Sequence, residues 1–119
     1  MPTWGIVVAV VVFIMIAGRA VFAVKPGAVL STSDEITYAR NVLAGVWARY
    51  GYQLTVTSGI DGDHMQQSKH YEGLAEDYRT RDVTPSDLSR MIAEARSILG
   101  SGYQVLNEVD HLHVEYDPR

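Results

Sequence analysis

The sequence contains no cysteine, which excludes a disulfide framework and any metal site built from thiolates. A bound metal would therefore have to be held by histidine and carboxylate groups. Basic residues are also few: from Lys25 onward there are nine Lys and Arg against fourteen Asp and Glu, a net charge of −5. Because nucleic-acid binding requires a basic surface, this balance argues against a nucleic-acid partner.

The chain lacks internal repeats and low-complexity tracts, and its 119 residues suggest a single domain. It has one long apolar run, residues 4–18, which carries no charge and is followed by Arg19 and a second short apolar stretch. We predict that residues 1–24 form a membrane anchor or a signal segment, with membrane contact through residues 4–24. The folded domain would then comprise residues 25–119.

The sequence leaves three interpretations of the apolar segment open. A membrane anchor is favoured, although a full span needs about 20 apolar residues and this run is shorter unless Arg19 lies near an interface. A signal peptide could be cleaved at residues 21–23, but the first three residues contain no Lys or Arg. The third interpretation is a buried valine-rich strand. Arg19 and Lys25 follow the segment, which by the positive-inside rule favours a cytoplasmic domain.

Helix and strand signals alternate in the rest of the chain, which predicts an α+β fold with a small, mostly antiparallel sheet and two main helices. Capping residues and apolar residues at helical spacing predict helices over residues 33–51 and 84–100. Alternating β-forming residues predict strands over residues 52–58, 74–80, 102–109 and 111–117, and the last two could also form one long bent strand. The loop between the first two strands, residues 59–73, is long and rich in glycine, and such loops are usually functional.

The four histidines fall in only two places. His64 and His70 lie in the long loop, and His111 and His113 lie in the last predicted strand. Random scatter over the chain would rarely give this distribution, so it indicates a site assembled from two segments. We assign no role to His64, which is best placed in the loop outside the site.

The loop half of this site combines an imidazole with a carboxylate. Gly73 lies between His70 and Asp77 and lets the chain turn back, so that Asp77 projects from the next strand. Ala75 shares a strand face with Asp77 and leaves room beside it. The two side chains could bind one cation, and the alternative is a solvated His–Asp pair on the surface.

The C-terminal half is the stretch "DHLH". His111 and His113 are two residues apart, which on a strand directs both imidazoles to one face. They could converge on a metal, and the alternative is a pair of half-exposed histidines. Three ligands from His and Asp with one open position are typical of catalytic zinc. A nearby carboxylate can act as general base, for which Asp110 and Glu108 are the candidates.

Together the two halves resemble the zinc D-alanyl-D-alanine carboxypeptidases and related peptidoglycan endopeptidases, which share a fold and metal site with the hedgehog signalling domain. The first family motif is Ser-x-His-x-x-Gly-x-Ala-x-Asp, and "SKHYEGLAED", residues 68–77, has every fixed position. The second motif is an acidic residue three before a His, or an arrangement ending in His-x-His, and residues 110–113 match it. The resemblance covers about residues 33–117. Within it, the stretch "SGIDGDHMQQSKHY", residues 58–71, is similar to small phage or prophage members of the family.

The resemblance implies that His70, Asp77 and His113 bind Zn²⁺ and that Asp110 is the general base. His111 would line the site and either stabilise an oxyanion or orient the substrate. The implied activity is hydrolysis of peptide bonds in peptidoglycan stem peptides, as in phage endolysins. Because these substrates lie outside the inner membrane, the resemblance implies that the protein is exported or anchored in the periplasm or cell envelope. This expectation overrides the cytoplasmic orientation that the positions of Arg19 and Lys25 favour, although the two signals conflict.

The family pattern also defines supporting residues and a second function. Ser68 and Arg79 would support a ligand or contact a substrate carboxylate. The alternative function is a non-catalytic zinc-binding module of the same fold, tethered to a membrane or associated with a virion, because fold and metal do not by themselves imply turnover.

Three positions raise questions about the resemblance. Asp110 replaces the commoner Glu, which shortens the side chain by one methylene. Glu108 stands three residues before His111, so a shifted register with Glu108 as base and His111 as ligand stays open. Glu76 occupies a position that is usually apolar in the family, which predicts that its strand face is exposed.

Overall fold

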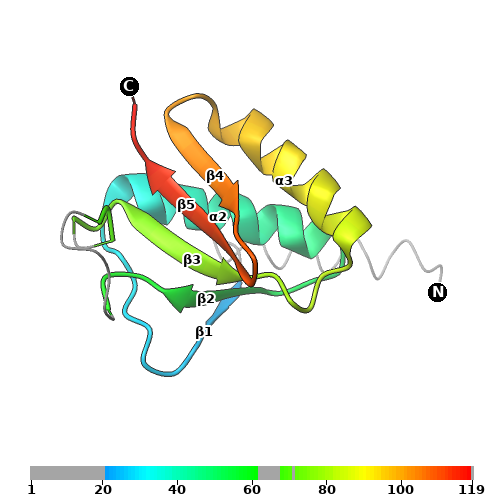
Figure 1. Cartoon of the computed structure of the whole chain (residues 1–119), viewed down its shortest axis with the longest axis horizontal. Helices are drawn as coiled ribbons and strands as arrows, with labels where there is room; N and C mark the ends of the chain where they lie inside the picture. The colour runs from blue at the N-terminus through cyan, green and yellow to red at the C-terminus, as the bar shows by residue number, and fades with distance from the viewer. Residues whose placement is uncertain (1–20, 62–67, 71, 119) are drawn as a thin grey trace, which may run out of the picture.

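The computed structural model describes residues 21–61, 68–70 and 72–118 of the chain (Figure 1). The elements follow in the order β1 (Phe22–Val24), α2 (Asp34–Arg49), β2 (Leu54–Ser58), β3 (Ala75–Arg79), α3 (Pro85–Leu99), β4 (Tyr103–Asn107) and β5 (His111–Tyr116). Both predicted helices and all four predicted strands are present, each slightly shorter than expected.

The strands form one sheet in the order β1-β2-β3-β5-β4. β1 pairs parallel with β2, with Phe22 opposite Leu54, and the other neighbouring strands pair antiparallel. The predicted α+β class is confirmed, but the prediction of a mostly antiparallel sheet is wrong, because the sheet is mixed. The parallel strand comes from three residues of the apolar stretch before Lys25, which are too few to show a strand period of their own.

The prediction of an anchor or signal segment falls mainly on residues 1–20, which lie outside the described residues, as does His64. Within the part of the chain that is described, no helix is long and apolar enough to cross a membrane. The chain after β1 is tied to the sheet, because the backbone N–H of Lys25 donates to the carbonyl of Val56 over 2.8 Å.

The helices begin at the capping residues that the sequence predicts. The Ser33 hydroxyl accepts a hydrogen bond from the N–H of Ile36 over 3.2 Å at the start of α2. Thr84 does the same for the N–H of Asp87 over 3.3 Å at the start of α3, where Pro85 occupies the first helical position. These side chains satisfy backbone donors that have no partner within the helix, which fixes where each helix starts.

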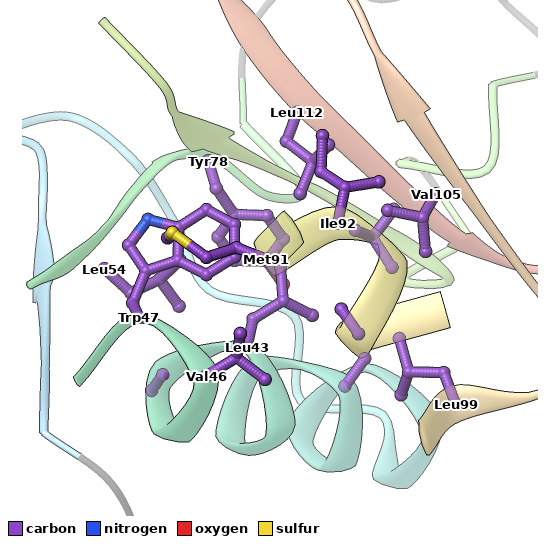
Figure 2. Packing of buried hydrophobic residues seen from close by; sticks show 14 of the residues in the cluster. Leu43, Val46, Trp47, Leu54, Tyr78, Met91, Ile92, Leu99, Val105 and Leu112 are labelled. Carbon is purple, nitrogen blue, oxygen red and sulfur yellow. The ribbon is translucent and has the colours of Figure 1, made fainter. Parts of the chain in front are cut away.

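Both helices pack on the same face of the sheet (Figure 1). Figure 2 shows side chains from α2, α3 and the strands interlocking in this layer, including Leu43, Trp47, Met91, Leu54 and Leu112. All five are at most 1% exposed. Burying each such side chain contributes about 1.5–3 kcal/mol, so this layer is the main source of stability.

The opposite face of the sheet carries the polar residues of the strands. In β5, Leu112 and Val114 are buried in the core, and His111, His113 and Glu115 alternate with them. Alternate side chains of a strand point to opposite faces, so these three polar residues lie on the face that the helices leave open. The fold therefore separates the core from the predicted site.

The core face also holds a buried ion pair, which corrects one prediction. Glu76 is fully buried, not exposed, and its carboxylate accepts hydrogen bonds from Arg40 Nε over 2.9 Å and Nη2 over 2.5 Å. The hydroxyl of Tyr78 donates to the same carboxylate over 3.0 Å, and the N–H of Ser31 does so over 2.8 Å. An acidic residue can occupy this apolar position because α2 supplies an arginine to pair with it.

Candidate metal centre

Three predicted ligands meet on the open face of the sheet. Asp77 in β3 lies directly opposite His113 in β5, and its Oδ1 is 2.8 Å from His113 Nδ1. The loop before β3 brings His70 Nε2 to 3.3 Å from both of these atoms. One ligand-capable atom from each residue lies within 4.8 Å of the others, the spacing that a single metal ion requires.

His70 is held in a fixed orientation by its neighbours. Its side chain is almost fully buried, and its Nδ1 donates to the carbonyl of Gly59 over 2.8 Å. Because a carbonyl only accepts, the proton of the neutral ring is on Nδ1, which leaves the Nε2 lone pair directed toward the other ligands. The backbone N–H of His70 also donates to the Ser68 hydroxyl over 3.1 Å, so Ser68 supports a ligand residue.

Gly73 makes the turn that the sequence predicts. Its φ of +74° is in the left-handed region that favours glycine, and its N–H donates to the carbonyl of His70 over 3.0 Å. The Gly73 carbonyl accepts hydrogen bonds from the hydroxyls of Ser31 and Ser33. The loop that carries His70 is thus attached to the start of α2.

Gly59 is a second glycine on which the site depends, and the sequence did not identify it. A Cβ at this position would overlap the carbonyl oxygen of Val29. The strands β2 and β3 also change register just before it, at a bulge between Val56 and Ser58. The close approach to Val29 therefore places the Gly59 carbonyl where it accepts from His70.

We expect Gly59→Ala to weaken binding of the zinc that the resemblance predicts, about 10- to 100-fold, because the clash displaces the carbonyl that orients His70. Overpacking of this kind should also destabilise the domain by about 1–3 kcal/mol. Zinc titration and thermal unfolding measure the two effects. The matched control is Gly45→Ala in α2, where a Cβ meets no atom within 4 Å and should raise stability by about 0.5–1 kcal/mol. Unchanged zinc affinity in Gly59→Ala would contradict this role.

The cluster shifts the pKa values of two of its members in opposite directions. Burial by itself would raise the pKa of Asp77, but hydrogen bonds from His113 and His70 and their charge outweigh it and hold the pKa well below its usual range. Burial by itself would lower the pKa of His113, but hydrogen bonds to Asp77 and Glu115 and their charge raise it overall. Without metal, the pair therefore favours a carboxylate beside an imidazolium.

These shifts predict how the stability of the fold depends on pH and how zinc should change that dependence. Asp77 stabilises the metal-free fold above its unfolded pKa, and that contribution is lost as pH falls through its lowered folded pKa. The contribution of His113 is complete below its unfolded pKa and is lost as pH rises through its raised folded pKa. The zinc that the resemblance predicts would require the deprotonated imidazole, so the rise in Tm expected on adding zinc should grow from about pH 5.5 to about pH 8. A zinc-induced rise in Tm that is constant over this range would contradict the assignment of His113.

Glu115 is a further member of the site that the sequence did not identify. His113 Nε2 donates to Glu115 Oε1 over 2.9 Å, on the side of the ring away from Asp77. A carboxylate in this position orients a histidine ligand and makes it more basic. The signal was present in the sequence, because Glu115 stands two residues after His113 and so shares its strand face.

The predicted catalytic pair lies at the rim of the cluster. His111 Nε2 is 3.9 Å from Asp77 Oδ1, and His111 Nδ1 donates to Asp110 Oδ1 over 2.6 Å. The Asp110 side chain is 84% exposed, and its hydrogen bond to His111 lowers its pKa. Asp77, Asp110 and His111 line one cavity of about 330 Å³. Asp110 is therefore beside the ligands but directed at His111.

The alternative base, Glu108, lies elsewhere. Its backbone N–H donates to the carbonyl of His111 over 2.9 Å in the turn between β4 and β5. Its side chain is exposed and contributes to a different cavity of about 670 Å³ against α3, which also includes Asp110. The three-residue cluster contains His113 and not His111, so the geometry favours His113 as the ligand and Asp110 as the candidate base.

The donor set is suited to a transition metal with an open position. Two imidazole nitrogens and one carboxylate oxygen converge, and each histidine has an outer partner, Gly59 for His70 and Glu115 for His113. Among the described residues, His, Asp and Glu form a metal-sized group of three only here. A comparison of the chain with protein-family models and with curated proteins found no match.

Proposed function

We propose that this protein is a zinc-dependent peptidase of the D-alanyl-D-alanine metallopeptidase type, acting on peptide bonds in peptidoglycan stem peptides. The observation that supports this most strongly is the convergence of His70, Asp77 and His113 on the open sheet face, with Asp110 and His111 in the adjoining cavity. These are the five residues to which the resemblance assigns metal binding or catalysis.

Zinc suits the site better than the common alkaline-earth ions. Magnesium and calcium prefer sets of oxygen ligands, whereas two imidazoles and one carboxylate are typical of catalytic zinc. When bound, zinc supplies a Lewis acid that polarises a carbonyl group and activates water. Asp77 also lines the adjoining cavity of about 330 Å³, which leaves space for part of a peptide.

Asp110 and His111 would carry out the proton transfers. Asp110 would accept a proton from the water that attacks the scissile carbonyl carbon, and would pass it to the amine as the carbon–nitrogen bond breaks. His111 would orient this carboxylate through its Nδ1–H. The hydrogen bond from His111 lowers the pKa of Asp110, so this carboxylate is ionised near neutral pH but is a weaker base than one whose pKa is raised toward neutrality. Its exposed position allows the side chain to rotate toward the substrate.

One observation favours the second candidate function, a zinc-binding module without turnover. Asp110 points to His111 rather than to the three ligands, and it is one methylene shorter than the Glu that is usual in the family. A base that is displaced by about 1 Å can lose much of its catalytic effect. For either function we propose that the apolar segment that precedes β1, residues 1–20, exports the domain or anchors it in the cell envelope.

The test compares the zinc-loaded full-length chain, purified in detergent, with Asp110→Asn and with Asp82→Asn as the matched control. Asp82 is exposed and lies outside the cavity that contains Asp77 and Asp110. We expect the wild type to release peptides from purified cell walls, a chelator to stop this, and Asp110→Asn to lower the rate about 10²- to 10⁴-fold with zinc content unchanged.

Each result has a defined meaning. Full lytic activity in Asp110→Asn, with zinc bound, would remove Asp110 from the mechanism. Stoichiometric zinc without cleavage of any wall peptide would establish the binding module. A wild-type protein that binds no zinc would contradict both candidate functions.

A further inference from the structure

Beyond Asp110, the cavity of about 670 Å³ against α3 contains no residue that the proposed chemistry uses. Its lining comes from the first half of α3, from the loop that leads from β3 into α3, and from the turn between β4 and β5, which lie at the same end of the domain (Figure 1). Arg81 and Asp110 line both this cavity and the smaller one beside Asp77. The two cavities therefore meet at these residues, and a substrate held at the proposed metal centre could extend from one into the other.

Four aliphatic side chains line this larger cavity. Val83 and Leu88 are half-buried and pack against the core, to which Ile92 belongs. Val109 joins them from the turn between β4 and β5, and its side chain is fully exposed. Ligand pockets of this size are lined mainly by apolar side chains, with a few polar groups that orient the ligand. The lining is therefore suited to a hydrocarbon chain.

Two guanidinium groups and two carboxylates also line the cavity, so their formal charges balance and their existing hydrogen bonds decide which of them can meet a ligand. Arg96 is directed to β4, where its Nη2 donates to the carbonyl of Val105 over 2.6 Å. Asp110 accepts from His111 over 2.6 Å. The side chain of Glu108 is exposed, and within the described part of the chain its carboxylate has no hydrogen bond or ion pair. Glu108 is therefore the carboxylate of this cavity that is available to a cation.

We propose that the larger cavity is a subsite for a lysine-type side chain of the substrate, a hydrocarbon chain that ends in an ammonium group. The inference rests on the proposed peptidase function and specifies its substrate class, peptides that carry such a residue next to the scissile bond. The hydrocarbon chain would pack on Leu88, Ile92 and Val109, and the ammonium group would pair with Glu108. The domain from Lys25 onward has nine Lys and Arg against fourteen Asp and Glu, which attracts cationic peptides to it.

The test measures kcat/KM of the zinc-loaded full-length chain on stem-peptide analogues in which one residue is alanine, norleucine or lysine, placed in turn before and after the scissile bond. In one of the two sets we expect norleucine to exceed alanine about 10- to 100-fold, because the longer chain covers the aliphatic lining. Lysine should exceed norleucine about 3-fold through its pair with Glu108. Glu108→Gln should remove the second preference and keep the first.

Matched variants on α3 test the cavity itself. Ser89 is exposed and lines the cavity, so Ser89→Phe should fill it and remove the preference for norleucine over alanine, with zinc content unchanged. Ser97 is exposed on the same helix and lies outside the cavity. Ser97→Phe should therefore keep the preference of the wild type.

A binding measurement separates this inference from the proposed activity. Calorimetric titration of the three peptides into zinc-loaded Asp110→Asn, in which cleavage should be slow, should show the same order of affinity. If that order is found and Ser89→Phe removes it, while the wild type cleaves none of the peptides, the subsite is supported and the peptidase function fails. If the wild type cleaves all three peptides with equal kcat/KM, the subsite is wrong and the peptidase function stands.

Two other results would contradict the role of Glu108. A preference for norleucine without any further gain for lysine would make the cavity a site for uncharged aliphatic side chains. An equal loss of activity on all three peptides in Glu108→Gln would make Glu108 the general base.

Discussion

Replacing Asp77 with asparagine is expected to lower zinc affinity roughly 10²- to 10³-fold and to abolish the proposed peptidase activity. Asp77 Oδ1 lies 2.8 Å from His113 Nδ1 and 3.3 Å from His70 Nε2, so it is the anion that joins both imidazoles. Zinc sites with four ligands bind with about 10–16 kcal/mol, so one ligand is worth on the order of 3–4 kcal/mol. That free energy corresponds to the stated loss of affinity.

One further variant and one further measurement on Asp77→Asn show whether the loss comes from the ligand itself. Glu115→Gln weakens only the outer partner of His113, so zinc affinity should fall about 10- to 100-fold, less than in Asp77→Asn. Asn keeps the shape of Asp77 but not its charge, so the raised pKa of His113 in the metal-free protein should fall toward its ordinary value. NMR titration of His113 measures this without any metal.

The opposite outcome would identify a different site. If Asp77→Asn bound zinc as the wild type does, Asp77 would not be a ligand. If His111→Ala abolished zinc binding while His113→Ala retained it, the shifted register with Glu108 as base would be correct. Direct titration with zinc distinguishes these cases before any assay of activity.

Local signals in the sequence, namely strand periodicity and the glycine between His70 and Asp77, indicated the candidate ligands, and the resemblance selected His113 rather than His111 as the third. The His-x-His spacing directs His111 and His113 to one sheet face. Gly73 marks the turn between His70 and Asp77 through its own backbone requirement, a positive φ. The pairing of Asp77 with His113 needed long-range information, which the resemblance of the two motifs supplied.

What the sequence did not predict depends on contacts between distant segments. Gly59 has to be glycine because the backbone of Val29 packs against it, and no sequence pattern near Gly59 indicates this contact. β1 forms a strand because its backbone pairs with the edge of β2. Glu76 was predicted to be exposed, and this was wrong because its buried partner, Arg40, lies 36 positions away in another element and cannot be recognised from the sequence around Glu76. Each of these requires knowledge of the tertiary structure.

The buried pair of Arg40 and Glu76 leads to the second large prediction, which concerns stability. Arg40→Met is expected to destabilise the metal-free domain by about 3–5 kcal/mol, because Glu76 is left as an uncompensated buried charge. Domains of this size have a total stability of about 5–15 kcal/mol, so much of the domain's stability would be lost. Chemical denaturation of the chelated protein measures the change.

Two comparisons assign the effect to burial of the charge. Arg49 lies on the same helix and pairs with Glu94 at the surface, with 53% of its side chain exposed, so Arg49→Met should cost only about 0–1 kcal/mol. The double variant Arg40→Met/Glu76→Leu removes both buried charges and should recover part of the loss. Recovery should be incomplete, because the N–H of Ser31 and the hydroxyl of Tyr78 lose the carboxylate that accepts from them. Equal costs for Arg40→Met and Arg49→Met would contradict this account.

The same pair supports the proposed metal centre from the opposite face of the sheet. Glu76 precedes Asp77 in β3, and Ser31, which donates to Glu76, also donates to the Gly73 carbonyl in the turn after His70. Zinc at about 1,000 times its dissociation constant stabilises the folded state by about 4 kcal/mol, which is comparable to the expected loss in Arg40→Met. Arg40→Met should therefore unfold readily with chelator and refold with zinc. The combination with Asp77→Asn should not be rescued, because its ligand set is incomplete. If zinc refolded that double variant as well, the metal would be acting elsewhere than at His70, Asp77 and His113.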